Sequence, residues 1–269
     1  MIVDFHTHVF PDKIAEKTVF ALAGNSKNTP YSNGSVDGLI NAMTIADADI
    51  SVSLPVLTKS TQFESVANFA IAINERFKNS SRKIISFAGM HPDCDNVEEK
   101  LLFLKNNGIK GFKIHPDYQE TFIDDPKYIK ILQVAKELDL IVVTHSGIDD
   151  GYKGKPVRCP VERVKNVVEK VGHKKFVLAH YGAHKQWQNV LENLCGLDVY
   201  FDTAFTLHEI EENLFKKIIK AHGEDKILFA TDSPWRDIKT DVEILKSYKL
   251  EKETEQKILY KNALKLLGV

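Results

Sequence analysis

Apolar and polar positions along the chain follow two alternating patterns. Short apolar runs rich in β-branched residues occur eight times, and such runs are typical of strands buried on both faces of a parallel sheet. Between them lie longer segments in which the apolar residues have helical spacing. The predicted strands span 1–5, 50–54, 83–88, 109–114, 140–144, 175–179, 197–201 and 226–230, and the predicted helices include 62–78, 97–107, 127–138, 161–171, 184–194 and 209–221.

The regular alternation of strand and helix predicts an α/β protein closed as a (β/α)8 TIM barrel. An open, doubly wound sheet is the alternative, but no glycine-rich phosphate loop follows the first strand. The amphipathic segment 252–267 predicts an extra C-terminal helix that caps the outside of the barrel. Because the chain has no repeat, linker or low-complexity tract, we expect residues 1–269 to form a single domain.

Two segments are expected to form long loops over the C-terminal mouth of the barrel, where such loops build active sites. Residues 9–35 follow the first strand and are rich in Asn, Ser, Gly and Pro, with a short helix inside. Residues 146–160 follow the fifth strand and carry Gly, Asp, Lys and Arg. Either loop could close over a substrate.

Composition narrows the choice of partners and compartment. The 36 basic and 37 acidic residues leave a net charge of −1, so no bulk field draws the chain to nucleic acid or a membrane. No apolar run approaches the roughly 20 residues of a membrane span, and no signal sequence is visible. The three cysteines have no paired spacing, which suits a reducing compartment. We expect a cytoplasmic protein with a small-molecule substrate; a homo-oligomer is compatible with the sequence.

Residues at the ends of the predicted strands carry the candidate chemistry. His6 and His8 lie two apart at the end of the first strand, so their side chains share one face. The ends of the fourth, fifth, sixth and eighth strands add further polar groups: Lys113, His115, His145, His180 and Asp232. All these ends meet at one rim of a closed barrel. Imidazole and carboxylate donors suit zinc, and also manganese, iron or nickel, so we expect one or two divalent ions, zinc foremost.

Asp232 and His180 are the candidate catalytic residues. A bound divalent ion makes water nucleophilic at neutral pH and polarises a carbonyl group. Asp232 would take the proton of the attacking water and pass it to the leaving group. His180 would be either a further metal ligand or a base that orients the water. Lys113 leaves three alternatives: a carboxylated lysine bridging two ions, a cation holding a substrate carboxylate, or a stem that runs to solvent.

Other polar residues receive lesser roles. The candidates for substrate binding are Lys113, His115, Arg158 and Trp235, and Arg236 is a weaker candidate for binding an anion. His91 ends the third strand and lines the mouth or has no role. The remaining histidines fall in helical or connecting stretches, and we expect them to be solvated: His173, His184, His208 and His222.

Six stretches of the chain resemble the amidohydrolase superfamily, in particular the amidohydrolase-2 branch of TIM-barrel metal-dependent hydrolases. They are DFHTHVFP at 4–11, GFKIHP at 111–116, THSG at 144–147, AHYG at 179–182, TDSPW at 231–235 and YKNALKLLG at 260–268. The resemblance implies that His6, His8, His145 and Asp232 are metal ligands. It places His180 as a second-metal ligand or base. Lys113 looks like the carboxylated lysine of dihydroorotase and hydantoinase relatives.

The leading functional hypothesis is a metal-dependent hydrolase that cleaves a C–N or C–O acyl bond of a small, anionic molecule. A metal-dependent decarboxylase or lyase is the alternative, since similar family members include decarboxylases and hydratases. A TatD-like DNase is disfavoured by the near-zero net charge and by Lys113, which replaces a glutamate of that branch. A non-catalytic binding barrel is disfavoured because buried imidazoles around an empty site are costly to retain.

Overall fold

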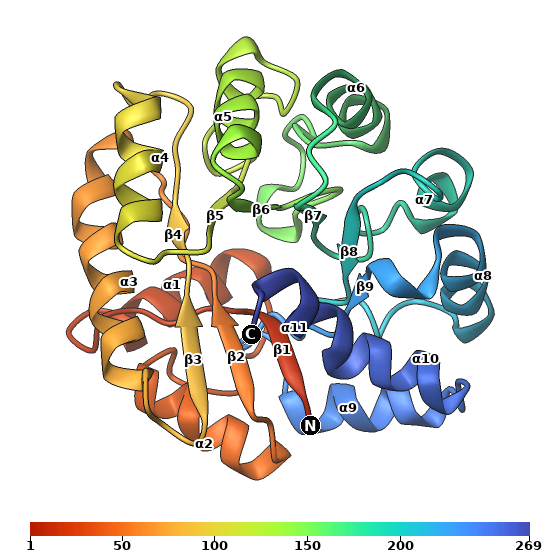
Figure 1. Ribbon diagram of the computed structural model, residues 1–269. Helices are drawn as coiled ribbons and strands as arrows, with labels where there is room; N and C mark the ends of the chain where they lie inside the picture. The colour runs from red at the N-terminus through yellow and green to blue at the C-terminus, as the bar shows by residue number, and fades with distance from the viewer.

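The computed structural model describes residues 1–269 and places a ring of parallel strands at the centre of the molecule, with helices outside it (Figure 1). One sheet has the order β1 (Val3–Thr7), β2 (Ile50–Ser53), β3 (Lys83–Ser86). A second sheet has the order β4 (Ala88–Gly89), β5 (Gly111–Ile114), β6 (Ile141–Thr144), β7 (Phe176–Leu178), β8 (Tyr200–Asp202), β9 (Ile227–Leu228).

Hydrogen bonds at two seams join these sheets into one closed barrel. Only Phe87 separates β3 from β4, and its N–H donates to the Ser53 carbonyl at 2.9 Å. The two strands are therefore one bent strand of the barrel, which pairs with β2 through β3 and with β5 through β4. At the other seam, the Phe5 N–H donates to the Phe229 carbonyl at 2.9 Å and the Asp232 N–H to the His6 carbonyl at 2.8 Å. The predicted TIM barrel is therefore confirmed, with eight strands when β3 and β4 are counted as one.

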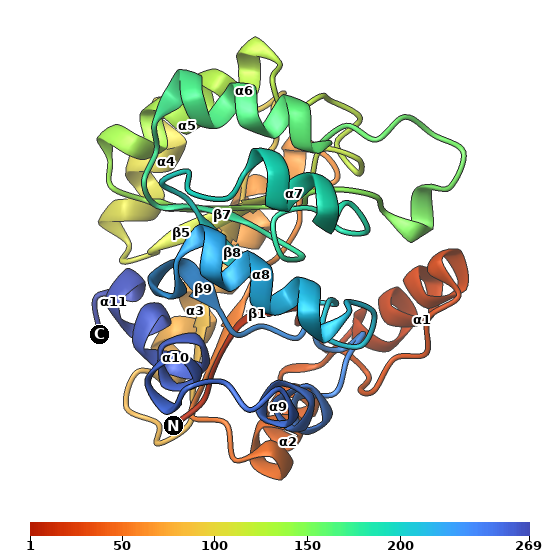
Figure 2. The ribbon, with the colours of Figure 1, turned by 90° about the vertical axis from the view of Figure 1, so that its right-hand side faces the viewer.

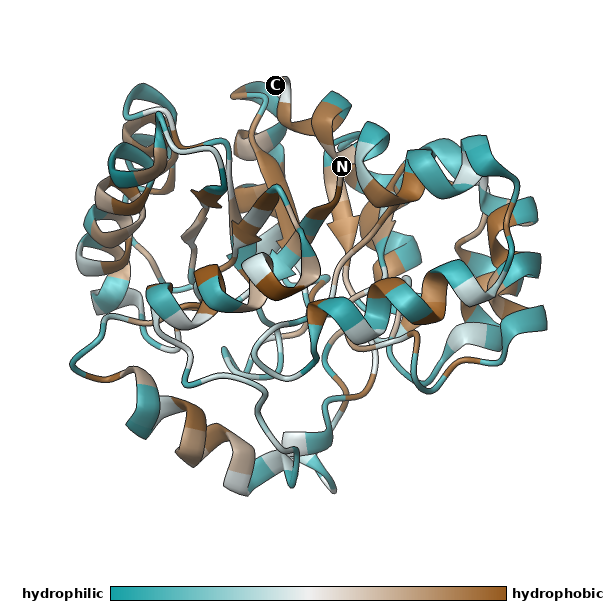
Figure 3. Ribbon diagram, turned by 90° about the horizontal axis from the view of Figure 1, so that it is seen from below, coloured by the Kyte–Doolittle hydropathy of each residue, from teal (hydrophilic) through white to brown (hydrophobic).

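Most of the helices turn their apolar faces to the barrel and their polar faces outward (Figure 3). In α6 the valines at 161, 164, 167, 168 and 171 are buried, and the helix ends at Gly172 in the left-handed region, as its sequence predicts. None of the helices has both the length and the apolar character needed to cross a bilayer. The outer helices are α1 (Ala15–Ser26), α2 (Val36–Ala46), α3 (Phe63–Phe77), α4 (Val97–Asn106), α5 (Pro126–Glu137), α6 (Val161–Val171), α7 (Trp187–Asn193), α8 (Glu212–His222) and α9 (Ile238–Ser247).

The C-terminal segment is helical as predicted, but its position differs from the prediction. It consists of α10 (Lys252–Gln256), the π-helical turn η4 (Lys257–Lys261) and α11 (Asn262–Leu267). Ala263, Leu266 and Leu267 join the apolar cluster inside the barrel, which includes Val3 and Phe87. The segment thus closes the amino-terminal end of the barrel rather than its outer wall, opposite the strand ends that carry the candidate site.

The expectation that His173 and His222 are solvated is wrong. Both are buried, and each ring donates through Nε2 to a backbone carbonyl, that of Leu140 at 2.9 Å and that of Val199 at 3.0 Å. The Nδ1 of His222 also accepts the Gly196 N–H at 3.3 Å. Burial lowers the pKa of each ring to about 4. These histidines are therefore neutral parts of the framework.

His222→Gln is expected to reduce the loss of stability in acid. The pKa of His222 is about 4 in the folded protein against an ordinary 6.5, so the unfolded chain takes up the proton first as the pH falls. The contribution of neutral His222 is complete above pH 6.5 and is lost toward pH 4. Denaturant unfolding at successive pH values should show a slope smaller by up to about 1.4 kcal/mol per pH unit in the variant. An unchanged slope would contradict this reading.

Candidate active site

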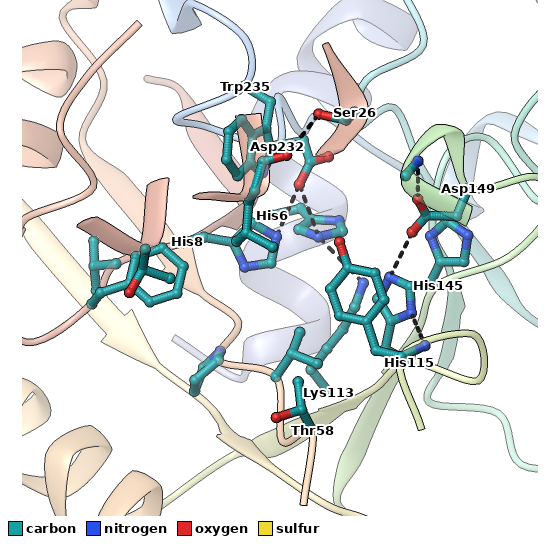
Figure 4. A pocket seen from close by; sticks show the side chains of 18 of the residues that line it. His6, His8, Ser26, Thr58, Lys113, His115, His145, Asp149, Asp232 and Trp235 are labelled. Atoms are coloured by element: carbon teal, nitrogen blue, oxygen red, sulfur yellow. Dashed lines mark hydrogen bonds and ion pairs between the residues drawn. The ribbon is translucent and has the colours of Figure 1, made fainter. Parts of the chain in front are cut away.

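A cavity of about 470 Å³ opens at the carboxyl ends of the strands. Its apolar lining includes Phe10, which follows β1, Leu22 of α1, and Val66 and Phe69 of α3. The segments that contain α1 and η2 (Asp150–Tyr152) extend from the same side of the barrel, and the two elements contact each other (Figure 2). The predicted site residues other than the two arginines line the cavity: His6, His8, Lys113, His115, His145, His180, Asp232 and Trp235. All of these except His180 are labelled in Figure 4.

His6 and His8 direct their Nε2 atoms toward the same carboxylate. The His8 Nε2 lies 2.9 Å and the His6 Nε2 3.4 Å from Oδ1 of Asp232. On the far side of each ring, the Nδ1 of His8 donates to the Leu54 carbonyl at 2.8 Å, and the Nδ1 of His6 lies 3.0 Å from Asp202 Oδ2. A proton held at Nδ1 leaves the Nε2 lone pair free, which is how imidazoles that bind metals are oriented.

Asp232 is ionised although it is buried. Burial opposes ionisation, but the adjacent rings of His6 and His8 hold the pKa of this carboxyl well below its usual range. The backbone of Asp232 has φ of 72°, in the left-handed region, and His180 has φ of 60°. A residue other than glycine adopts this conformation at a cost of order 1 kcal/mol or more. The strained backbone turns both side chains into the cavity.

His145 and His180 form a second pair of imidazoles. The Nδ1 of His145 lies 2.9 Å from Nε2 of His180, whose own Nδ1 lies 3.0 Å from the Ala204 carbonyl. Burial lowers the pKa of His180 to about 4 and that of His145 well below its usual value. Both rings are therefore neutral and can offer lone pairs.

Lys113 lies between the two groups of donors. It is buried, its Nζ is 3.2 Å from the His6 Nε2, and it lines the cavity rather than running to solvent. Burial lowers the pKa of its amine to about 8, while the carboxylates of Asp202 and Asp232 limit the shift. A neutral amine is thus accessible near neutral pH.

His115 belongs to a column of stacked rings beside this centre. Its ring lies parallel to that of His145, with centroids 4.2 Å apart, and stacks on Tyr118 at 3.8 Å. The His115 Nδ1 accepts the Tyr118 N–H, so its Nε2 carries the proton and faces Asp149 Oδ2 at 3.4 Å. Burial raises the pKa of Asp149 to about 6. This tautomer suits a hydrogen-bond donor to a substrate better than a metal ligand.

The structure does not bring the predicted arginines into the cavity. Arg158 lies outside its lining, and its guanidinium is 3.9 Å from Asp117 behind His145. Arg236 binds the buried carboxylate of Asp241 at 2.6 Å. Both guanidinium groups are turned toward internal carboxylates, so the structure does not support their role in binding substrate.

Sequence reasoning missed several residues of the site, among them Tyr118 and Asp149 beside His115. Asp202, which follows the seventh predicted strand directly, holds the Nδ1 side of His6, and its place at a strand end was the available signal. His184, expected to be solvated, is buried and lines the cavity. The backbone at Gly147, with φ of 89°, approaches it so closely that a Cβ there would lie 2.2 Å from the His184 nitrogen. His91 is buried but does not line the cavity, and His208 is exposed, as the sequence predicted.

The donor set fits a divalent metal ion. Three imidazoles, those of His6, His8 and His180, have their Nδ1 atoms held by oxygen acceptors, and the Asp232 carboxylate lies within reach of the Nε2 atoms of His6 and His8. The donor atoms of His6, His8 and Asp232 all lie within 4.8 Å of one another. The barrel fold and this set of donors are those that a metal-dependent TIM-barrel enzyme requires.

Comparison with known proteins identifies the family. The model of a family described as amidohydrolase matches residues 3–269. The chain belongs to this amidohydrolase family and, within it, to the amidohydrolase-2 branch that its motifs resemble. A search of the curated proteins gives no significant match.

Solved structures with the same fold cover nearly the whole chain. A TIM-barrel protein of Bordetella bronchiseptica has a TM-score of 0.78 at 14% identity, covering 99% of this chain and 98% of its own. A 5-carboxyvanillate decarboxylase of Novosphingobium aromaticivorans with bound manganese has a TM-score of 0.73 at 12% identity, covering 100% and 97%. A dihydroxybenzoic acid decarboxylase of a Polaromonas species, with bound manganese and 2-nitroresorcinol, has a TM-score of 0.72 at 14% identity, covering 99% and 96%. At these identities the likeness shows the fold alone.

Proposed function

We propose that this chain is a metal-dependent hydrolase that cleaves a C–N or C–O acyl bond of a small, anionic molecule. The observation that carries the proposal is the convergence of His6, His8 and Asp232 on one point of the cavity, with Asp232 kept ionised by its neighbours. An ionised carboxylate beside a cation can take the proton of an attacking water, which acyl hydrolysis requires.

Each site residue would have a role that follows from its position in the cavity. His6, His8 and Asp232 would hold one ion, and His145 with His180 a second, with zinc the first ion to test and manganese the next. When bound, such an ion makes water a better nucleophile and polarises a carbonyl group. Asp232 accepts the proton of the attacking water and returns it to the leaving group. His115 donates from its Nε2 to an oxygen of the substrate.

The cavity sets the form of the substrate. Its volume of about 470 Å³ suits a small molecule rather than a polymer. Trp235 and the apolar side chains of Phe10, Leu22, Val66 and Phe69 would pack against the part of the substrate that does not react. With the non-reacting part of the substrate packed against these side chains, the reacting acyl group would face the strand ends.

Decarboxylation is the second candidate function. It is favoured by the two similar structures named above as decarboxylases, both of which hold manganese. The same site could serve this reaction, because a cation that orients a carboxylate next to neutral imidazoles can assist both loss of carbon dioxide and delivery of a proton.

Metal analysis followed by a substrate panel tests the proposal. Protein purified without chelator is expected to hold at least one divalent ion per chain, and its activity should disappear on chelation and return with zinc or manganese. The panel contains lactones, cyclic amides and aromatic carboxylates. Opening of a lactone or cyclic amide supports the hydrolase; release of carbon dioxide from an aromatic carboxylate supports the decarboxylase instead. A chain that binds no ion would overturn both.

A further inference from the structure

Two buried polar atoms, one of them on His145, face each other without hydrogen-bond partners. They are the Nε2 of His145 and the Oδ2 of Asp117, 3.7 Å apart, and neither makes a hydrogen bond. Asp117 is 1% exposed, and its other oxygen, Oδ1, accepts the Arg158 N–H at 3.0 Å. Burial of unpaired polar atoms is costly, so a facing pair of this kind needs a reason.

A count of the protons on the two imidazoles gives that reason. His180 donates from Nδ1 to the Ala204 carbonyl, so its Nε2 presents a lone pair to Nδ1 of His145. If His145 carries its proton on Nδ1, it bonds to His180, but its Nε2 lone pair then faces the Asp117 carboxylate. If the proton is on Nε2, it points at Asp117, and two lone pairs converge from His145 Nδ1 and His180 Nε2, as a cation requires.

We propose that Asp117 is a positioning residue that holds His145 in the tautomer protonated on Nε2, so that Nδ1 is presented to a metal ion, and that Arg158 fixes Asp117 in turn. This inference rests on the metal dependence in the proposed function. It also gives Arg158 a structural role in place of the substrate contact that the sequence suggested.

The surroundings favour this arrangement. Parallel stacking on His115 holds the plane of the His145 ring. The Arg158 backbone N–H fixes one carboxylate oxygen of Asp117, and its guanidinium lies 3.9 Å from the same oxygen, with Nη1 unpaired. The distance of 3.7 Å exceeds that of a normal hydrogen bond by about 0.8 Å, and bonds in an active site commonly tighten when the ligand binds.

Asp117→Asn is the sharpest test, because the amide keeps the shape of the carboxylate but reverses which tautomer of His145 is favoured. The Asn carbonyl oxygen can accept the Arg158 N–H, which turns the amide N–H toward His145 Nε2. That contact favours the tautomer of His145 that is protonated on Nδ1. The variant is expected to bind its most weakly held Co²⁺ about 10- to 100-fold less tightly in competition with a chelator. The visible spectrum of the Co²⁺-loaded protein should change, and ¹⁵N NMR of the wild type loaded with diamagnetic Zn²⁺ should show His145 protonated on Nε2.

Asp124→Asn is the matched control. Asp124 lies on the same segment between β5 and α5 and pairs with Arg163 at 2.6 Å, away from His145. This variant should bind Co²⁺ as the wild type does. Unchanged Co²⁺ affinity in Asp117→Asn would overturn the inference, as would an Nδ1 proton on His145 in the loaded wild type. A metal-free Asp117→Asn protein that melts well below the metal-free wild type would point to a merely structural role and also overturn it.

The two proposals can fail separately. If the wild type binds Co²⁺ and Asp117→Asn loses it, but the panel shows no hydrolysis, the positioning role stands and the hydrolase assignment fails. If the panel shows hydrolysis and both variants keep their Co²⁺, the hydrolase assignment stands and the role of Asp117 fails.

Discussion

Asp232→Asn is expected to lower kcat/KM by about 1,000-fold or more, the upper part of the range for loss of a positioned acid–base group. The amide cannot take a proton from water, and its neutral oxygen is a weaker partner for a cation between His6 and His8. The loss should appear in kcat, because the role of Asp232 in proton transfer is confined to the reaction itself. Steady-state kinetics on the substrate found by the panel measures the effect.

Asp237→Asn provides the control for loss of charge in the same segment. Asp237 caps α9, and its side chain accepts the Thr240 N–H at 2.9 Å. Asparagine caps helices about as well as aspartate, so this variant should keep both its fold and its activity. Melting of the metal-free proteins checks the fold of both variants. If Asp232→Asn retained activity within tenfold of the wild type, the assignment of the proton shuttle would be wrong.

The rim of donors was predictable because the barrel imposes it. Parallel strands in a closed ring end at one rim, so the order of motifs alone brings His6, His145 and Asp232 together although they are far apart in the sequence. The i, i+2 relation of His6 and His8 is similarly local. For these residues the sequence pattern and the structure agree.

The errors concern contacts between segments distant in the sequence. His184 falls at the start of a predicted helix, but α7 begins at Trp187, and the approach of Gly147 brings the preceding loop inward. His173 and His222 are buried against the carbonyls of Leu140 and Val199, which directly precede β6 and β8, and periodicity along the chain does not reveal these contacts. Arg158 lies on a mouth loop as expected, but a carboxylate behind His145 turns it away from the cavity.

Lys113→Ala is expected to release one metal ion per chain and to lower activity about 100-fold. The second pair of donors, His145 and His180, supplies only two nitrogens, and the amine of Lys113 lies beside His6. The pKa of about 8 makes the neutral amine available near neutral pH, and that amine can add carbon dioxide with release of a proton. The resulting carbamate would bring a negative charge between two cations, where an ammonium group would repel them.

Three measurements separate this role from simple binding of an anion. The ion count of Lys113→Ala should fall, and acetate or propionate should restore part of its activity by replacing the missing carboxylate. Lys110 directly precedes the amino-terminal end of β5, and its ammonium group donates to the Leu267 carbonyl at 2.7 Å. The control variant Lys110→Ala removes this cation and should keep all of its metal ions. An unchanged ion count in Lys113→Ala with a raised KM alone would instead assign Lys113 to the substrate carboxylate, since a lost anion contact weakens binding without removing metal.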